Sequence, residues 1–400
     1  MKKRLFAAAA LLALVLTGCA QPPSPAADSV SPPENTPPPA VSVPAEEAPP
    51  VEEPELETEP PTMQDQARTI LEGMTREEVV GQLFFVRYPG DSGLAAQWAK
   101  DYHLGGYILF GRDFKDSTPD GMREKIAASQ AASSTPMFIG VDEEGGTVVR
   151  ASYYPAFRAE KFKSPQKLFA QGGLEAIRAD ALEKSTFLKD LGINVNLAPV
   201  ADVSTDPDDF IYDRAFGQGA GETAEYAAVV VNAMKEQGMG SVLKHFPGYG
   251  NNVDTHTGIA YDTRPLEQFL TGDLLPFRSG GEAGAGAVLV SHNIVTCLDE
   301  TLPASLSPAA YKLLREEAGF SGVAMTDDLD MAAVGEYVED GSAVVQALSA
   351  GADMVLTSVP QKQIPQVLSA LETGDLSWER VQEGAYRVLT WKMELGLISP

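Results

Sequence analysis

Cysteine and histidine, on which many metal and redox sites depend, are scarce in this chain. Its 400 residues include two cysteines and four histidines. If Cys19, next to the amino-terminal apolar run, is modified, Cys297 is left alone and no intramolecular disulfide is expected. We interpret Cys297 as a small buried residue.

Positive charge is scarce as well. The chain has 30 Lys and Arg residues against 56 Asp and Glu residues, a formal net charge of −26. The phosphates of nucleic acid would be repelled by such a surface, so no nucleic-acid partner is expected. The apolar fraction of 44% is ample for a sizeable core, and the length suits one large α/β domain or two to three average ones.

Signatures of several widespread chemistries are missing. The sequence has no G-x-S-x-G elbow, H-E-x-x-H helix, C-x-x-C pair, P-loop or G-x-G-x-x-G fingerprint. Residues 217–221 are glycine-rich, but their spacing is wrong for a dinucleotide turn and no clear strand precedes them. We therefore expect no cofactor.

The amino-terminal apolar run, residues 5–16, is too short to span a membrane as a mature helix. Three basic residues precede it and small residues follow it, as in a secretory signal peptide. Leu16-Thr17-Gly18-Cys19 also resembles the bacterial lipobox. We expect residues 1–18 to be a lipoprotein signal peptide and Cys19 to carry lipid that anchors the protein to the cell membrane, outside the cytoplasm. The alternative is an ordinary signal peptide with an incidental cysteine.

The next segment has the composition of a disordered linker. Residues 20–62 contain fourteen prolines and nine acidic residues but no Lys or Arg. Without apolar periodicity this segment cannot bury enough surface to fold. We expect residues 19–62 to be a lipidated, extended, Pro/Glu-rich tether and residues 63–400 to form the folded part.

From Met63 onward, eight short apolar or β-branched runs alternate with helical patterns. The runs are Gln82 to Val86, Gly106 to Phe110, Pro136 to Val141, Ile193 to Ala198, Ser241 to Lys244, Ala287 to Val290, Gly322 to Met325 and Asp353 to Leu356. The helical patterns cover residues 65–74, 119–133, 164–190, 221–237, 265–278, 307–318, 340–350, 361–373 and 377–395. Apolar strands alternating with helices indicate a parallel sheet covered on both faces. Eight of them predict an α/β protein with a single (β/α)8 TIM-type barrel; a doubly wound open sheet is the alternative.

Polar residues stand at the carboxyl ends of six predicted strands, where barrel enzymes keep their chemistry. They are Asp142, Asn196, Lys244-His245, Ser291-His292, Asp327-Asp328 and Thr357-Ser358. Such a residue could instead cap the following helix, which is our interpretation of Thr357-Ser358. Because neighbours on a strand point to opposite faces, only one of Asp327 and Asp328 is expected to face the pocket. Residues 143–146 predict a tight turn.

The stretch from Lys244 to His256 is the first candidate for chemistry. It follows a predicted strand and holds two of the four histidines. Asp254 and His256 can lie on one side of an extended loop, and a carboxylate beside an imidazole suits general acid–base work near neutral pH. Alternatively, the histidines are satisfied by backbone groups, or His245, Asp254 and His256 bind a metal. The flanking Lys244 favours a metal-free site.

Four segments carry a family resemblance: residues 74–84, 141–150, 244–256 and 326–331. Together they resemble glycoside hydrolase family 3, in a match that covers about residues 63 to 396. Residues 74–84 are similar to its opening helix and first strand, and residues 141–150 to its sugar-binding strand. The stretch 244–256 resembles the signature loop of its β-N-acetylhexosaminidase branch, and residues 326–331 resemble its nucleophile strand. Tyr249 stands where the loop usually has His, and three residues rather than four separate Gly250 from Asp254.

The resemblance implies a two-step retaining hydrolysis. Asp327 would be the nucleophile, and His256, assisted by Asp254, the acid–base catalyst. The residues implied to bind an N-acetylglucosamine unit are Asp142, Arg150, Arg214, Lys244 and His245. With the expected lipid anchor, we infer a surface-anchored exo-β-N-acetylglucosaminidase that acts on peptidoglycan fragments.

Two other functions stay open. A β-N-acetylglucosaminide phosphorylase could use the same site, because a neutral or cationic histidine does not repel phosphate as a glutamate would. The third is a non-catalytic lipoprotein that holds wall sugars. The intact trio of Asp254, His256 and Asp327 argues against it.

Overall fold

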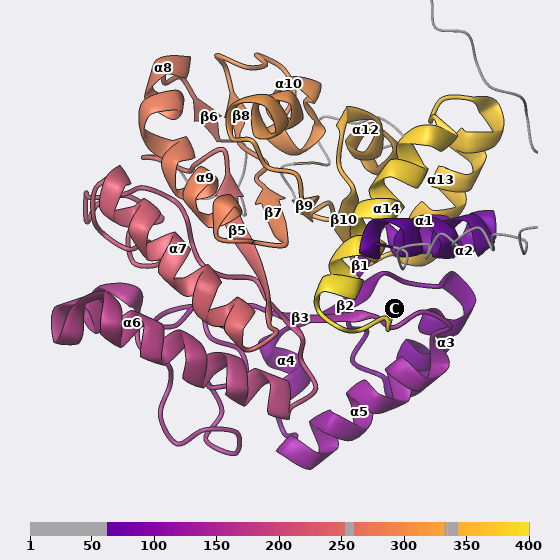
Figure 1. The fold of residues 1–400 in the computed structure, drawn as a ribbon, viewed down its shortest axis with the longest axis horizontal. Helices are drawn as coiled ribbons and strands as arrows, with labels where there is room; N and C mark the ends of the chain where they lie inside the picture. The colour runs from indigo at the N-terminus through magenta and orange to yellow at the C-terminus, as the bar shows by residue number, and fades with distance from the viewer. Residues whose placement is uncertain (1–61, 253–259, 332–333, 335–342, 400) are drawn as a thin grey trace, which may run out of the picture. The chain divides into compact units, whose positions relative to one another are not determined.

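The computed structural model describes residues 62–252, 260–331, 334 and 343–399. Within them, eight parallel strands close into a barrel in the order β1-β10-β9-β7-β5-β4-β3-β2 (Figure 1). The strands are β1 (Phe84–Arg87), β2 (Gly106–Leu109), β3 (Phe138–Val141), β4 (Val195–Asn196), β5 (Gly240–Phe246), β7 (Ala287–Val290), β9 (Val323–Asp328) and β10 (Met354–Thr357). Each predicted run overlaps one of these strands, so the (β/α)8 barrel is confirmed and the open sheet is excluded.

Helices surround the barrel and connect its strands (Figure 1). They are α1 (Met63–Gly73), α2 (Arg76–Gln82), α3 (Ser92–Tyr102), α4 (Gly111–Phe114), α5 (Pro119–Ala132), α6 (Pro165–Asp190), α7 (Ala220–Glu236), α8 (Leu266–Gln268), α9 (Leu274–Glu282), α10 (Pro308–Lys312), α12 (Ala343–Ala350), α13 (Pro360–Thr373) and α14 (Trp378–Glu394). Their starts follow local sequence: Thr75 and Glu78 form a capping box at α2, and Ser164 caps α6 before a proline.

Three predicted helices are interrupted, and two helices lie outside the predicted segments. Within α6, Gly172 and Gly173 have non-helical backbone angles and form a kink. A π-helical turn at Phe269–Asp273 separates α8 from α9, and another at Leu313–Glu317 follows α10. Helices α3 and α4 had no predicted counterpart. The α3 segment is rich in small and polar residues and buries only Ala95 and Ala99, so its apolar periodicity is weak.

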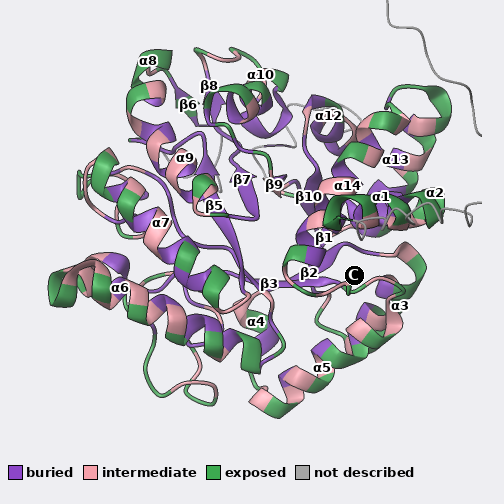
Figure 2. Cartoon of the chain, in the orientation of Figure 1, coloured by how far each residue is buried: buried purple, intermediate pink, exposed green. Residues whose placement is uncertain are grey.

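Apolar side chains fill both the barrel interior and the layer between barrel and helices. On β1, Phe85 belongs to the interior cluster, whereas Phe84 and Val86 pack in the outer layer. Both faces of the strands are therefore buried, as the purple strands of Figure 2 show, and their sequences are apolar without alternation. Trp391 of α14 packs at the amino-terminal ends of the strands, where a Cβ on Gly286 would lie 1.8 Å from its Nε1 atom.

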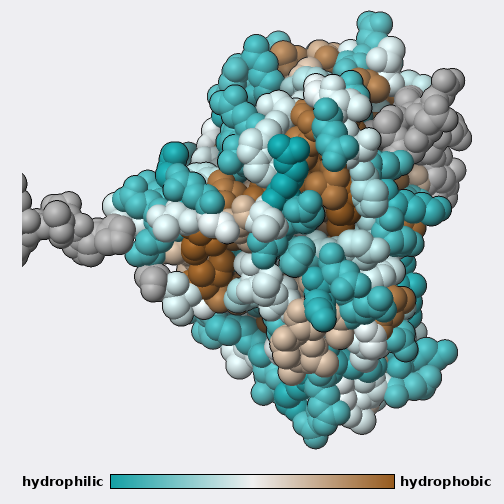
Figure 3. All heavy atoms as spheres, turned by 90° about the vertical axis from the view of Figure 1, so that its right-hand side faces the viewer, coloured by the Kyte–Doolittle hydropathy of each residue, from teal (hydrophilic) through white to brown (hydrophobic). Residues whose placement is uncertain are grey.

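The face of the molecule drawn in Figure 3 is mostly hydrophilic, and its apolar surface is divided into separate patches. Among the described residues, no helix is both long enough and apolar enough to cross a bilayer. A small second sheet pairs β6 (Tyr261–Asp262) with β8 (Ile294–Val295).

Cys297 is exposed, so its interpretation as a buried residue is wrong. It lies in the turn that follows β8. The two residues of β8 are buried, but the chain turns outward directly after them. The end of so short a strand cannot be predicted from composition. For this reason Cys297 was wrongly expected to be buried.

Candidate active site

A cavity of about 350 Å³ lies at the carboxyl ends of the barrel strands. The structure brings together around it the five residues implied to bind the sugar and the implied nucleophile: Asp142, Arg150, Arg214, Lys244, His245 and Asp327. Asp254 and His256, the implied acid–base pair, lie outside the described residues, as does Cys19.

Lys244 and His245 both line the cavity although they are consecutive on β5. Lys244 pairs with Leu289 of β7, and Phe246 pairs with the very next residue, Val290. The Lys244–His245 peptide bond is cis. An extra residue on β5 forms a β-bulge, a feature that redirects side chains next to active sites. The bulge presents an ammonium group and an imidazole to the same cavity.

Asp327 and Asp328 also both line the cavity, so the expectation that only one would face it is wrong. Met325 of β9 pairs with Met354 of β10, but Asp328 pairs with Leu356. Three steps along β9 thus oppose two along β10, and this irregularity breaks the alternation of side chains. The backbone N–H of Asp328 donates to Asp327 Oδ1 at 2.8 Å.

Alternating charges form one wall of the cavity. Lys244 Nζ lies 2.7 Å from Asp142 Oδ1 and 2.6 Å from Glu144 Oε1. Arg214 donates to Glu144 through Nε at 3.0 Å and Nη2 at 2.8 Å, and Arg150 Nη2 lies 3.4 Å from Asp142. Burial favours the neutral acids, but these cations lower the pKa of Asp142 and that of Glu144 below their ordinary values. Both carboxylates are therefore ionised at neutral pH.

His245 is held in one tautomer by two partners. Arg214 Nη2 lies 3.1 Å from His245 Nε2, and a guanidinium can only donate, so Nε2 accepts. The ring proton is then on Nδ1, which donates to Asp202 Oδ2 at 2.8 Å. Asp202 also accepts from the backbone N–H of Tyr249 at 2.8 Å. Asp202 was not among the predicted site residues, because several other aspartates follow it in the same loop and no spacing distinguishes it.

Glu143 supports the site from behind. Its carboxylate accepts from the backbone N–H groups of Arg150 at 3.0 Å and Ala151 at 2.8 Å, and from the hydroxyl of Ser152. Asn196 pairs with its backbone, accepting from Glu143 N at 2.9 Å and donating to Glu143 O at 3.1 Å. Burial raises the pKa of Glu143. This residue therefore fixes the segment that carries Arg150.

Two more of the polar strand ends support the cavity without lining it. His292 is fully buried, and its Nε2 donates to the backbone oxygen of Asp328 at 3.0 Å. Thr357 and Ser358 donate from their hydroxyls to Asp330 Oδ2 at 3.2 and 2.6 Å. Neither of these two residues is the N-cap of α13, so that interpretation is wrong. Both hydroxyls, at the end of β10, therefore bind Asp330, which follows β9.

Arg87, at the end of β1, is a cavity residue without a sequence signal. Its guanidinium lies over the ring of Phe110, 4.5 Å from the centroid, and Arg150 lies over the same ring at 5.6 Å. Arg87 Nη1 is 3.7 Å from Asp328 Oδ2. Burial raises the pKa of Asp328 to about 6, the nearby carboxylates of Asp327 and Asp330 act in the same direction, and Arg87 opposes them.

Arg264 forms hydrogen bonds with described residues on both sides of the segment 253–259. Its Nη1 donates to Asp273 Oδ1 at 2.9 Å, and its Nη2 donates to Asp262 Oδ2 at 2.7 Å and to the Gly248 backbone oxygen at 3.1 Å. Asn252 donates to the same Asp262 oxygen at 2.9 Å. In the described part of the chain, no three His, Cys, Asp or Glu side chains are grouped so as to hold a metal ion.

The fold and the site place the chain among barrel enzymes whose chemistry lies at the carboxyl ends of the strands. The family model described as "Glycosyl hydrolase family 3 N terminal domain" matches residues 75–391. The chain belongs to this family and is a glycoside hydrolase.

Curated and solved relatives agree with this assignment. "Beta-hexosaminidase LpqI" of Mycobacterium tuberculosis is 35% identical over 304 residues, which cover 73% of this chain and 76% of that protein. The solved structure of M. tuberculosis LpqI has a TM-score of 0.73 and 31% identity, covering 82% of this chain and 96% of that one. A glycoside hydrolase family 3 beta-N-acetylglucosaminidase from Paenibacillus sp. str. FPU-7 has a TM-score of 0.75 and 28% identity, covering 82% and 64%.

Proposed function

We propose that this protein is a retaining exo-β-N-acetylglucosaminidase that removes terminal N-acetylglucosamine, with peptidoglycan fragments as its substrates. The observation that carries the proposal is the convergence of Asp142, Lys244, Arg214 and Asp327 on one cavity. Its volume of about 350 Å³ is at the small end of the range for ligand pockets, which suits a single terminal sugar ring. The names of the relatives support the choice of sugar.

In the first step, a carboxylate oxygen of Asp327 attacks the anomeric carbon and the glycosidic bond breaks. His256, oriented by Asp254, gives its proton to the departing oxygen. A covalent glycosyl-enzyme and a free alcohol result. Charged donors and acceptors that line the same cavity, Lys244 and Asp142 among them, hold the hydroxyls of the sugar while the bond is broken.

In the second step, His256 takes a proton from water, and the resulting nucleophile attacks the same anomeric carbon. Asp327 leaves as a carboxylate, and two inversions give net retention. His245 takes no part in proton transfer, because both its ring nitrogens are engaged, by Asp202 and by Arg214. It positions Arg214 instead.

Incubation with a chromogenic β-N-acetylglucosaminide, with and without inorganic phosphate, tests this function. The expected result is release of the chromophore and of free N-acetylglucosamine in the absence of phosphate. Release that requires phosphate and yields a sugar 1-phosphate would identify a phosphorylase. If the chromophore is released under neither condition, the remaining alternative is a non-catalytic sugar-binding lipoprotein. Its binding is then measured with a soluble disaccharide from the cell wall.

We further propose that the enzyme is a lipoprotein anchored to the cell membrane through Cys19. The support is the basic start, the apolar run and the lipobox-like Leu16 to Cys19. In Cys19→Ala, lipid attachment should stop and the protein should leave the membrane fraction, with specific activity unchanged. A variant that still fractionates with membranes would show that this cysteine is not the anchor.

A further inference from the structure

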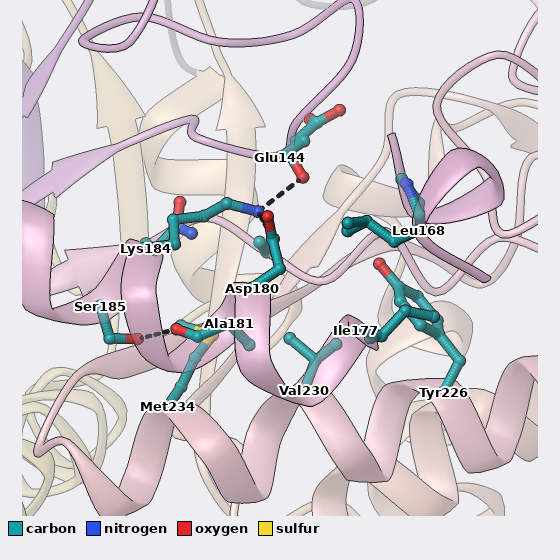
Figure 4. Close-up of a pocket in the computed structure, with 13 residues that line it drawn as sticks. Glu144, Leu168, Ile177, Asp180, Ala181, Lys184, Ser185, Tyr226, Val230 and Met234 are labelled. Atoms are coloured by element: carbon teal, nitrogen blue, oxygen red, sulfur yellow. Dashed lines mark hydrogen bonds and ion pairs between the residues drawn. The ribbon is translucent and has the colours of Figure 1, made fainter. Parts of the chain in front are cut away.

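A small cavity lies behind the charged wall of the active site, between α6, α7 and the turn that follows β3 (Figure 4). Its volume of about 20 Å³ leaves room for about one water molecule. In this view Glu144 lies at the top, Asp180 and Lys184 of α6 line one side, and Tyr226 of α7 lies below. Apolar side chains of the two helices, Ile177 and Val230 among them, line most of the rest of the cavity.

Lys184 crosses this space and contacts the turn. Its side chain is buried, with 8% of the residue exposed. The Nζ atom donates to the backbone oxygen of Glu144 at 3.1 Å and lies 2.9 Å from Asp180 Oδ2 (Figure 4). A buried ammonium group needs such partners, because an unpaired charge in this environment is strongly destabilising. Lys184 therefore contacts the backbone of Glu144 and does not reach the substrate cavity.

Glu144 is the residue through which Lys184 reaches the site. The backbone oxygen of Glu144 binds Lys184, while its carboxylate binds Arg214 and Lys244 on the cavity side. The next residue, Gly145, has a φ of +102°, and a Cβ there would lie 2.2 Å from the backbone oxygen of Lys163. The turn is therefore closely fitted on one side. The backbone N–H groups of Glu144 and Gly145 donate to the Val148 backbone oxygen at 3.0 and 3.1 Å, and on the side of the small cavity the Glu144 backbone oxygen binds Lys184.

We propose that Lys184 is a positioning residue for sugar binding: it fixes the main chain of Glu144 so that the carboxylate aligns Arg214 and Lys244. The inference rests on the proposed function, because it assumes that these two cations bind the sugar. Lys184 does not line the substrate cavity. Its role is to set the position of groups that do.

Lys184→Met tests the proposal, because it removes the donor and the charge but keeps most of the volume. For a chromogenic N-acetylglucosaminide, KM should rise about tenfold, the factor that corresponds to one charge-assisted hydrogen bond. The kcat value should stay within about twofold, since uniform binding is lost and not the chemistry. Lys184→Arg keeps a cationic donor and should restore KM to within about threefold of the wild type. Lys167→Met, an exposed lysine on the same helix, is the matched control.

A double-mutant cycle with Glu144→Gln asks whether Lys184 acts through Glu144. In the Glu144→Gln background, Lys184→Met should change KM by less than about twofold, because the group it positions has already lost its charge. Independent, multiplicative effects of the two changes on KM would overturn the proposal.

Unchanged KM in a folded Lys184→Met protein would also overturn it and leave Lys184 a purely structural residue. If Lys184→Met does not fold, Lys184→Gln removes the charge and shortens the side chain while keeping it polar, and an unchanged KM there has the same meaning. Failure of the proposed function looks different. In that case the wild-type protein itself does not release the chromophore, and the affinity of the same variants for N-acetylglucosamine, measured by calorimetry, replaces KM with the same expected ratios.

Discussion

The buried lysine of the last helix gives a prediction that can be worked out in magnitude. Lys392 has no exposed surface, and its Nζ donates to Gln82 Oε1 at 2.6 Å. The ring of Phe138 lies 5.3 Å away. Burial lowers the pKa of Lys392 from 10.5 to about 7. The unfolded chain, in contrast, holds this proton up to about pH 10.5.

The sign of the pH dependence follows from proton counting. Between pH 7 and pH 10.5 the unfolded chain binds more protons at this site than the folded chain, so the unfolding free energy rises with pH. The slope reaches about 1.4 kcal/mol per pH unit. At pH 7 nearly the whole penalty for holding Lys392 is present, about 4 kcal/mol, and below about pH 6, where the folded and the unfolded chain both bind the proton, it is constant.

Lys392→Met removes this penalty and leaves Gln82 Oε1 without its donor, which costs about 1–3 kcal/mol. The variant should therefore be more stable than the wild type by about 1–3 kcal/mol at pH 7. It should be less stable above about pH 10, where the wild-type lysine is neutral and still donates to Gln82.

Chemical denaturation at a series of pH values from 7 to 10.5 measures the unfolding free energy of the variant and of the wild type. The difference between the two is compared across pH, because other groups titrate in both proteins. Lys362→Met, on the exposed face of α13, is the control and should give a difference that does not change with pH. A difference for Lys392→Met that is equally flat would refute the reasoning, since it would mean that the buried lysine keeps its ordinary pKa.

Three further predictions concern reactive groups. Asp327→Asn should lower kcat by at least about 10⁴-fold. Asp328→Asn should lower kcat by about ten- to a hundredfold, because the backbone N–H of residue 328 still orients Asp327. A trapped sugar found on Asp328 by mass spectrometry would reverse the assignment. His256→Ala should lose about 10²- to 10⁴-fold in activity on a disaccharide and less on a nitrophenyl substrate, and it should form a β-glycosyl azide when azide is added. Equal losses of activity on the two substrates, with no azide product, would mean that His256 only binds substrate. Cys297 should react with Ellman's reagent in the folded protein, at a rate that increases about tenfold per pH unit below its burial-raised pKa; a thiol that reacts only after unfolding would contradict its exposure.

The barrel could be predicted because its sequence signal is local. Strands buried on both faces require short apolar runs, as Phe84, Phe85 and Val86 illustrate. The polar residue that ends such a run must lie at the carboxyl edge, and closure of the sheet then brings these edges together. Asp142 and Lys244 could be assigned to one cavity on that argument alone.

The two bulges could not be predicted, because they depend on pairing between strands. Alternation on β9 says that Asp327 and Asp328 point apart, and only the shifted register against β10 shows otherwise. The same holds for the residues behind the cavity. Glu143 reads as part of a turn, and nothing in its neighbourhood reveals that its carboxylate holds the backbone of Arg150.

The charges of the cavity wall are matched to an uncharged polyol. Lys244 contacts both Asp142 and Glu144, and Glu144 contacts both Lys244 and Arg214, so each charge is already compensated inside the protein. A neutral sugar can exchange hydrogen bonds with such a wall without leaving any charge unpaired. Loss of one member disturbs the others: Arg214→Met would leave Glu144 with Lys244 alone, which is itself shared with Asp142, and would remove the donor to His245 Nε2. The wall therefore acts as a unit, and sugar affinity should fall further with Arg214→Met than the loss of a single hydrogen bond to the sugar would explain.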